Sequence, residues 1–117
     1  MKKNKIICFD IDNIICRTIN KNYKKSKPIK KVISLINSLY SKGFIIKIFT
    51  ARHMGKFKGN IKKVNKYGYK KTYNQLKKWG LKFDELIMGK PSYDIFIDDK
   101  AFGDEKNWIN LLKKKIN

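Results

Sequence analysis

The sequence predicts an α/β domain, a three-layer Rossmann-like fold built on a parallel sheet. Two observations carry this prediction. Short apolar runs of strand length alternate along the chain with longer segments of helical period, which is the order of a parallel sheet covered by helices. The length of 117 residues suits a single domain over 1–117, and the chain shows no internal repeat and no linker.

Four apolar runs are expected to form strands. They are "KIICFD" at 5–10, "FIIKIFT" at 44–50, "ELIM" at 85–88 and "DIFID" at 94–98. Apolar residues follow one another in the first two runs with little alternation, as in strands that are buried on both faces. Cys8 lies inside the first run and is therefore expected to be a small core residue.

Three segments have the features of helices. The segment 28–43 begins at a proline, carries one apolar stripe and ends at Gly43. The segment 69–80 places aromatic and leucine side chains on a similar stripe and ends at Gly80. The last segment, about 104–115, opens with acids and closes with lysines, the charge order that a helix dipole favours.

The segment 51–68 has no clear period and contains three glycines and many lysines. It directly follows the carboxyl end of a predicted strand, which is where α/β proteins bind ligands. We therefore expect a long functional loop or a small flap-like insertion at 51–68.

The net charge of +20 favours anionic partners in general without naming one. Only Arg17 and Arg52 are arginine, and the lysines are scattered over almost every segment. Because nucleic-acid surfaces favour arginine forks, most of this charge is expected to be solvated surface, and nucleic-acid binding is expected to be weak and non-specific. No run is long enough to cross a membrane, and Asp10 interrupts the apolar start too early for a signal peptide, so a cytoplasmic protein is predicted.

Polar side chains stand at the end of every predicted strand. They are Asp10 and Asp12, then Thr50, then Lys90, and finally Asp98 and Asp99. Because the carboxyl ends of parallel strands meet at one edge of a sheet, we expect these side chains to lie together.

Crowded carboxylates repel one another and resist loss of water, and a hard divalent cation removes that conflict. Carboxylates with water and phosphate are the ligands that suit Mg²⁺. Lys90 and the hydroxyl of Thr50 could then hold the oxygens of a phosphoryl group beside the metal. A carboxylate can also attack phosphorus to form an aspartyl-phosphate. The pattern therefore predicts phosphoryl chemistry.

The stretches "FDIDNIIC", "IFTAR", "MGKP" and "IDD", spread in this order over 6–99, resemble the four motifs of the haloacid dehalogenase (HAD) superfamily. The resemblance implies that Asp10 is the nucleophile and that Asp12 is the general acid and then the general base. It implies phosphoryl binding by Thr50 and Lys90, with Ala51 and Arg52 added to the substrate-binding set. It further implies a Mg²⁺ ion held by the following groups: Asp10, the main-chain carbonyl of Asp12, Asp98 and, directly or through water, Asp99.

The chain departs from the family pattern in two ways. Asn13 and Ile14 stand where the family usually has glycine and threonine. Asparagine tolerates a positive φ, so the turn can survive, whereas Ile14 lacks a hydroxyl that commonly assists the loop. The strands are also too closely spaced for a large cap domain, so the segments 13–27 and 51–68 would have to cover the substrate.

The resemblance implies a Mg²⁺-dependent phosphomonoester hydrolase that acts through an aspartyl-phosphate. The stretch "TAR…GKPSYDIFIDDKA", with "QLKKWG" between, is similar to small bacterial phosphatases of capsule and lipopolysaccharide biosynthesis. That similarity implies a small phosphorylated metabolite of surface polysaccharide biosynthesis, such as a sugar phosphate or a nucleotide-linked precursor.

Two other functions stay open. A nucleotide or polynucleotide-end phosphatase is one, because family members without a cap can accept large substrates. A non-enzymatic basic nucleic-acid-binding domain is the other, and it would use Tyr67, Tyr69, Tyr73 and Trp79 for stacking. Those aromatics follow a helical period, so packing explains them more simply, and the acids at the strand ends would repel phosphates. The oligomeric state is not predicted, although a partner subunit could supply a lid.

Overall fold

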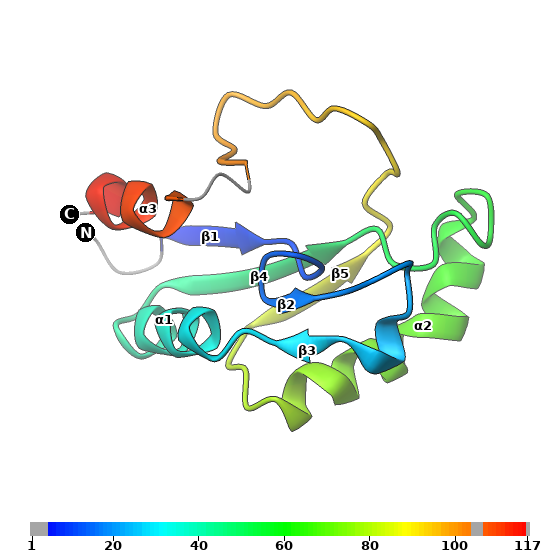
Figure 1. Cartoon of the computed structure of the whole chain (residues 1–117), viewed down its shortest axis with the longest axis horizontal. Helices are drawn as coiled ribbons and strands as arrows, with labels where there is room; N and C mark the ends of the chain where they lie inside the picture. The colour runs from blue at the N-terminus through cyan, green and yellow to red at the C-terminus, as the bar shows by residue number, and fades with distance from the viewer. Residues whose placement is uncertain (1–4, 104–106, 117) are drawn as a thin grey trace.

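A computed structural model describes residues 5–103 and 107–116 of the chain (Figure 1). Its centre is a three-stranded parallel sheet of β1 (Ile6–Phe9), β4 (Ile45–Thr50) and β5 (Glu85–Met88), in the order β1-β4-β5. This confirms the predicted α/β class with a parallel sheet.

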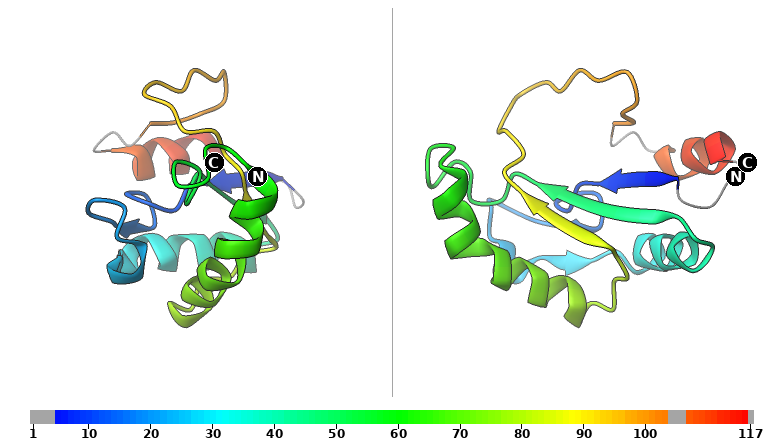
Figure 2. Two further views of the ribbon diagram at one scale, coloured as in Figure 1. Left: turned by 90° about the vertical axis from the view of Figure 1, so that its right-hand side faces the viewer. Right: turned by 180° about the vertical axis from the view of Figure 1, so that it is seen from behind.

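Helices pack against the sheet because their apolar stripes need burial. Helix α1 (Lys30–Ser41) packs on β4, and α2 (Ile61–Lys78) packs on β5. Helix α3 (Trp108–Ile116) lies on the other side of β1 from α1, as both views show (Figures 1 and 2). The described residues thus form a small layered domain and include no cap.

The core lies between the sheet and the helices. Along β4, side chains alternate between buried and half-buried, and Ile46 and Ile48 are fully enclosed. The other large side chains that are almost fully buried come from the loop after β1, from α1 and α2, and from the loop after α2: Ile11, Ile15, Ile36, Val64, Leu76 and Leu81.

The segment between β1 and α1 forms a small antiparallel ribbon beside the sheet. It consists of β2 (Cys16–Arg17), the 3₁₀ turn η1 (Tyr23–Lys25) and β3 (Lys27–Pro28). Its first turn is made by Asn13, which has φ 64° and donates its backbone N–H to the carbonyl of Cys16 at 2.7 Å. The expected positive φ at Asn13 is confirmed, because asparagine is among the residues that tolerate this region.

The long loop predicted at 51–68 is shorter than expected. Turns occupy 51–60, and the second half of the segment belongs to α2. The Asn60 side chain caps this helix by accepting from the backbone N–H of Lys63 at 3.1 Å. Buried residues then recur every four positions, at Val64, Gly68 and Thr72. Gly68 is therefore a packing position inside a helix, although the sequence suggested a break.

The fourth predicted strand, 94–98, does not form. These residues lie in an irregular exposed segment that follows β5, and Ile95 and Ile97 are 79% and 92% exposed (Figure 1). A strand needs a ladder of hydrogen bonds from a neighbour, and propensity alone cannot supply one. A local cluster holds part of the segment instead, in which the ammonium of Lys90 faces the rings of Tyr93 and Phe96.

The missing fourth strand changes the environment of β1. Cys8, expected in the core, is exposed, and Ile6 is 58% exposed. Within residues 5–103 and 107–116, β1 pairs with β4 and with no other strand, so its outer edge is free.

The predicted start of the last helix at Asp104 and Glu105 lies outside the described residues. In the part of the chain that the structure covers, no helix is both long and apolar enough to pass through a bilayer.

Candidate active site

Asp10 lies directly after β1, at the carboxyl end of the sheet. One carboxylate oxygen, Oδ1, accepts the backbone N–H of Ile11 at 2.7 Å, which fixes the rotamer. The other, Oδ2, lies 3.4 Å from Nζ of Lys90, with 34% of the Asp10 side chain exposed. The sheet thus brings together two predicted site residues that are 80 positions apart in sequence.

Lys90 is positioned by the end of β4. Its backbone N–H donates to the carbonyl of Thr50 at 3.1 Å, after a turn in which Gly89 has φ 96°. Burial lowers the pKa of Lys90, but interactions with the Tyr93 side chain and with Asp10 outweigh this effect, so the pKa is raised above its ordinary value. Lys90 therefore stays a cation at neutral pH.

Burial raises the pKa of the Asp10 carboxyl above its usual range. The Lys90 ammonium and the hydrogen bond from Ile11 work in the opposite direction but do not cancel the effect of burial. A carboxylate with reduced hydration beside a fixed cation has the properties of a nucleophile that waits for an anionic substrate.

Thr50 ends β4 and is fully buried. Its Oγ1 accepts the backbone N–H of Arg52 at 3.1 Å, which leaves the hydroxyl proton for another acceptor. Ala51 is half-buried against the core, and its carbonyl accepts the N–H of Met54 at 3.0 Å. In this structure Ala51 therefore has a packing contact and a turn contact.

Arg52 holds Asp12. The guanidinium meets both carboxylate oxygens, with NH2 at 2.9 Å from Oδ1 and Nε at 3.0 Å from Oδ2, and the Arg52 side chain is 2% exposed. Such a forked pair fixes the carboxylate in both position and orientation. Sequence reasoning gave Arg52 a role towards substrate and missed the contact with Asp12. The position of an arginine two residues after the strand-end threonine was the only available signal.

A polar network surrounds this pair. Gln75 on α2 accepts from Arg52 NH1 at 2.6 Å and donates to the carbonyl of Tyr23 at 2.7 Å. On the other side, the hydroxyl of Thr18 donates to Asp12 Oδ1 at 2.5 Å. Sequence reasoning gave none of these three partners a role, because their function follows from contacts between segments far apart in the chain.

The ring of His53, in the turns at 51–60, contacts both η1 and α2. It contacts Tyr23 and Tyr67 edge-on, with 5.1 Å between ring centroids in each case. Tyr23 in turn covers the guanidinium of Arg52 at 4.8 Å. Burial, followed by the nearby Arg52, lowers the pKa of His53, so its ring is neutral at pH 7. His53 therefore helps to hold the cover over Arg52.

The predicted metal ligands are only partly assembled. Asp10 and Asp12 lie at the end of β1, whereas Asp98 and Asp99 are exposed in the segment after β5. Among residues 5–103 and 107–116, no group of three or more acidic, histidine or cysteine side chains could hold a metal ion. The Asp12 carboxylate is occupied by Arg52, so the oxygen donors left at the end of β1 are the Asp10 carboxylate and the main-chain carbonyl of Asp12. Together with a substrate phosphate they fit Mg²⁺ in part.

The comparisons with known proteins support the fold. No family model matches the sequence, and no curated protein matches it. A structural genomics target from Vibrio cholerae is similar in structure, with a TM-score of 0.80 and 27% identity over 97% of this chain and 99% of that one.

More distant structures are also similar. A chain of the Pnkp1/Rnl/Hen1 complex matches with a TM-score of 0.55 and 15% identity, and this protein covers 33% of it. The D,D-heptose 1,7-bisphosphate phosphatase of B. bronchiseptica, whose structure contains magnesium and phosphate, matches with a TM-score of 0.50 and 14% identity, and this protein covers 64% of it. At these identities the likeness shows the fold, which is that of a small HAD-like α/β domain.

Proposed function

We propose that this protein is a Mg²⁺-dependent phosphomonoester hydrolase that uses Asp10 as its nucleophile. The observation that carries the proposal is the Asp10–Lys90 pair, a partly buried carboxylate 3.4 Å from a fixed ammonium at the carboxyl end of a HAD-like sheet. The likeness to a bisphosphate phosphatase with the same fold agrees with it.

In the first step, a carboxylate oxygen of Asp10 attacks phosphorus and the bond from phosphorus to the ester oxygen breaks. The leaving oxygen takes a proton from Asp12, and an acyl-phosphate remains on Asp10. In the second step, Asp12 takes a proton from water and the resulting hydroxide attacks phosphorus. The bond from phosphorus to the Asp10 oxygen breaks, which releases inorganic phosphate and restores the Asp10 carboxylate. Lys90 stabilises the charge on the equatorial oxygens in both steps.

Arg52 sets the direction of the Asp12 carboxylate during this exchange. Because its fork occupies both oxygens of Asp12, proton transfer requires one of those hydrogen bonds to be shared or released. The Thr18 hydroxyl also donates to Oδ1, and this hydrogen bond can be exchanged without loss of the ion pair.

Asp10 and the main-chain carbonyl of Asp12 would hold Mg²⁺, and Asp98 and Asp99 would complete the site. When bound, the ion neutralises charge on the phosphoryl group. For Asp98 and Asp99 to reach it, the segment 94–98 would have to pair with the free edge of β1, which would also bury Ile95 and Ile97.

We further propose a small phosphorylated metabolite, a sugar phosphate or nucleotide-linked precursor of surface polysaccharide, as a substrate. The support is the resemblance of the stretch "TAR…GKPSYDIFIDDKA" to small phosphatases of capsule and lipopolysaccharide biosynthesis. A nucleotide or a polynucleotide end is the second candidate, and the aromatic and cationic lining of the cavity beside Arg52 favours it.

The test is hydrolysis of a generic aryl phosphate with and without Mg²⁺. We expect turnover that EDTA abolishes and excess Mg²⁺ restores, and that falls by at least a thousandfold in Asp10→Asn. Glu85→Gln is the matched control, because it removes an exposed carboxylate from β5, the strand beyond β4, and should keep full activity. If the wild-type protein hydrolyses no phosphomonoester in a broad panel, the proposed function is wrong.

A further inference from the structure

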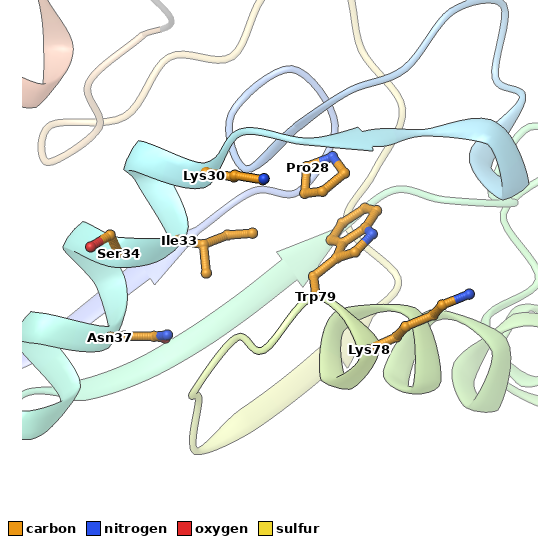
Figure 3. Close-up of a pocket in the computed structure, with 7 residues that line it drawn as sticks. All are labelled: Pro28, Lys30, Ile33, Ser34, Asn37, Lys78 and Trp79. Carbon is orange, nitrogen blue, oxygen red and sulfur yellow. The ribbon is translucent and has the colours of Figure 1, made fainter.

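Two cavities with shared lining residues follow α2 away from Arg52, and we call them together the groove. One cavity of about 750 Å³ lies between η1 and α2, and a second of about 440 Å³ lies between α1 and the end of α2. Lys78 and Trp79 line both cavities, so the two adjoin. Figure 3 shows the Trp79 indole pointing from the end of α2 towards Pro28, with Lys78 beside it.

The floor of the larger cavity is built from polar side chains that are almost fully buried. Arg52 is 2% exposed and Thr72 is 1% exposed, and both line the cavity. The Arg52 guanidinium contacts Asp12 directly, so one end of the groove lies a single side chain away from the proposed general acid. The hydrogen bonds of Arg52 to Asp12 and Gln75 hold this floor rigid.

The walls combine aromatic rings with cations. The rings are those of Tyr23, His53, Tyr67 and Trp79, and the cations on the rim are Lys24, Lys71 and Lys78. Within the described parts of the chain, no acidic residue lines either cavity. The groove therefore offers ring faces and edges next to positive charge, and no charge that would repel an anion.

We propose that this groove binds a single-stranded nucleic acid, with bases against the rings of Tyr23 and Trp79 and phosphates against Lys24, Lys71 and Lys78. Stacking on aromatic side chains with a cationic rim is the general means of holding single strands without reading their sequence. A duplex is a poor fit because its bases are already stacked and paired. That the bound strand presents a terminal phosphate to Asp10 rests on the proposed function, whereas binding in the groove does not.

The two cavities together offer more room than a sugar phosphate needs. The larger cavity alone has the volume of a site for one drug-sized ligand, about 300–1,000 Å³, and the second cavity adds to it. A sugar phosphate would leave the adjoining cavity empty. A short strand of several nucleotides would reach both.

Tryptophan fluorescence gives a direct test. The chain has two tryptophans, so in Trp108→Phe all tryptophan emission comes from Trp79. Titration of this variant, with Asp10→Asn added to prevent hydrolysis, uses an oligo(dT) of eight nucleotides at low salt. We expect saturable quenching of more than a third of the emission, since stacking on the indole quenches it.

Heparin is the control polyanion, because it carries charge and no bases. We expect it to compete with the strand while quenching Trp79 much less. Equal quenching by heparin, or no quenching by the strand, would overturn the proposal in favour of unspecific anion binding.

A matched pair of triple variants locates the site. Lys24→Gln, Lys71→Gln and Lys78→Gln together remove three charges from the groove rim, and Lys31→Gln, Lys62→Gln and Lys66→Gln together remove three exposed charges elsewhere. We expect the groove variant to bind the strand at least tenfold more weakly than the control variant. Its log–log salt slope should also fall by about 0.7 for each lost phosphate contact. Equal losses in the two variants would place the binding on the general charge and contradict the proposal.

The two proposals fail separately. Binding is measured in the inactive Asp10→Asn background, so it does not depend on the hydrolase reaction. If the strand quenches Trp79 but the wild-type protein has no phosphatase activity, the binding proposal stands and the proposed function is wrong. If the protein is active but the strand does not quench Trp79, the proposed function stands and the binding proposal is wrong.

Discussion

Arg52 and Arg17 are the two arginines of the chain, and they have opposite environments. Arg17 is exposed on β2, whereas Arg52 is buried and forks onto Asp12. Lysine keeps the positive charge but cannot form two parallel hydrogen bonds to a carboxylate. Arg52→Lys and Arg17→Lys should therefore have different effects.

We expect Arg52→Lys to lower the free energy of unfolding by about 2–3 kcal/mol, because buried hydrogen bonds to charged groups are lost. It should also reduce kcat by at least tenfold, since Asp12 loses its orientation. Arg17→Lys should change stability by less than about 0.5 kcal/mol and leave activity intact. Urea unfolding and steady-state kinetics of both variants provide the measurement, and equal behaviour would show that the fork is unimportant.

The raised pKa of Asp10 has a consequence for the stability of the protein without bound metal. A carboxyl whose pKa is higher in the folded than in the unfolded chain favours folding below its unfolded pKa, and that contribution is lost as pH rises through the folded pKa.

Asp10→Asn should therefore be more stable than wild type at pH 7. The gain should be below about 1 kcal/mol, because a third of the Asp10 side chain is exposed and the Lys90 pair is lost at the same time. The difference should shrink as the pH falls into the range where Asp10 is protonated. Thermal unfolding from pH 4 to pH 8 measures it, and a variant less stable than wild type at pH 7 would contradict the burial argument.

At the scale of elements, α2 depends on a close contact between Gly68 and the His53 ring. A Cβ on Gly68 would lie 2.3 Å from Cδ2 of His53, which no side chain tolerates. In a helix without this contact, alanine is about 1 kcal/mol more favourable than glycine. The ring contact therefore opposes helix propensity at this position.

We expect Gly68→Ala to destabilise the protein by about 1–3 kcal/mol, because His53 must move and its contacts with Tyr23 and Tyr67 change. In a His53→Ala background the same change should be neutral or stabilising, since the clash is gone. A double-mutant cycle by urea unfolding measures the coupling. Additive effects of the two substitutions would show that the contact is absent.

The elements show which sequence signals sufficed. Apolar runs placed the three strands of the sheet, because burial of such runs is a local property. The start of α2 was misplaced, because Gly68 and nearby lysines hid a cap at Asn60 and buried positions spaced by four. The prediction of a strand at 94–98 was wrong for another reason. Strand pairing depends on a neighbouring strand and not only on the apolar run.

In the candidate site, too, some residues could be predicted from local sequence patterns and others could not. The strand-end positions of Asp10, Thr50 and Lys90 followed from the parallel sheet. The fork of Arg52 on Asp12 did not, because it depends on how the turns at 51–60 lie against η1 and α2. Contacts of that kind are set by three-dimensional packing and leave no periodic pattern in the sequence.

At the scale of the whole molecule, the segment 91–103 follows β5 as an irregular chain with its side chains exposed. If Asp98 and Asp99 complete a Mg²⁺ site, binding of the ion should draw 94–98 onto β1. We expect amide exchange at Ile95 and Ile97 to slow by at least tenfold on addition of Mg²⁺ with phosphate. Asp98→Asn should prevent this protection while Asp94→Asn should not. Unchanged exchange would show that these aspartates take no part in metal binding.

The free edge of β1 also bears on how the protein behaves in concentrated solution. Its unpaired backbone groups are a template for a strand from another molecule, and the exposed isoleucines at 95 and 97 are suitable apolar partners. A net charge of +20 keeps the molecules apart at low ionic strength. Salt at about 0.1 M shortens the range of that repulsion to about 10 Å. It does not reduce the capacity of the β1 edge to pair with a strand from another molecule. Buffers of low ionic strength should therefore keep this protein monodisperse, and added salt should make it aggregate.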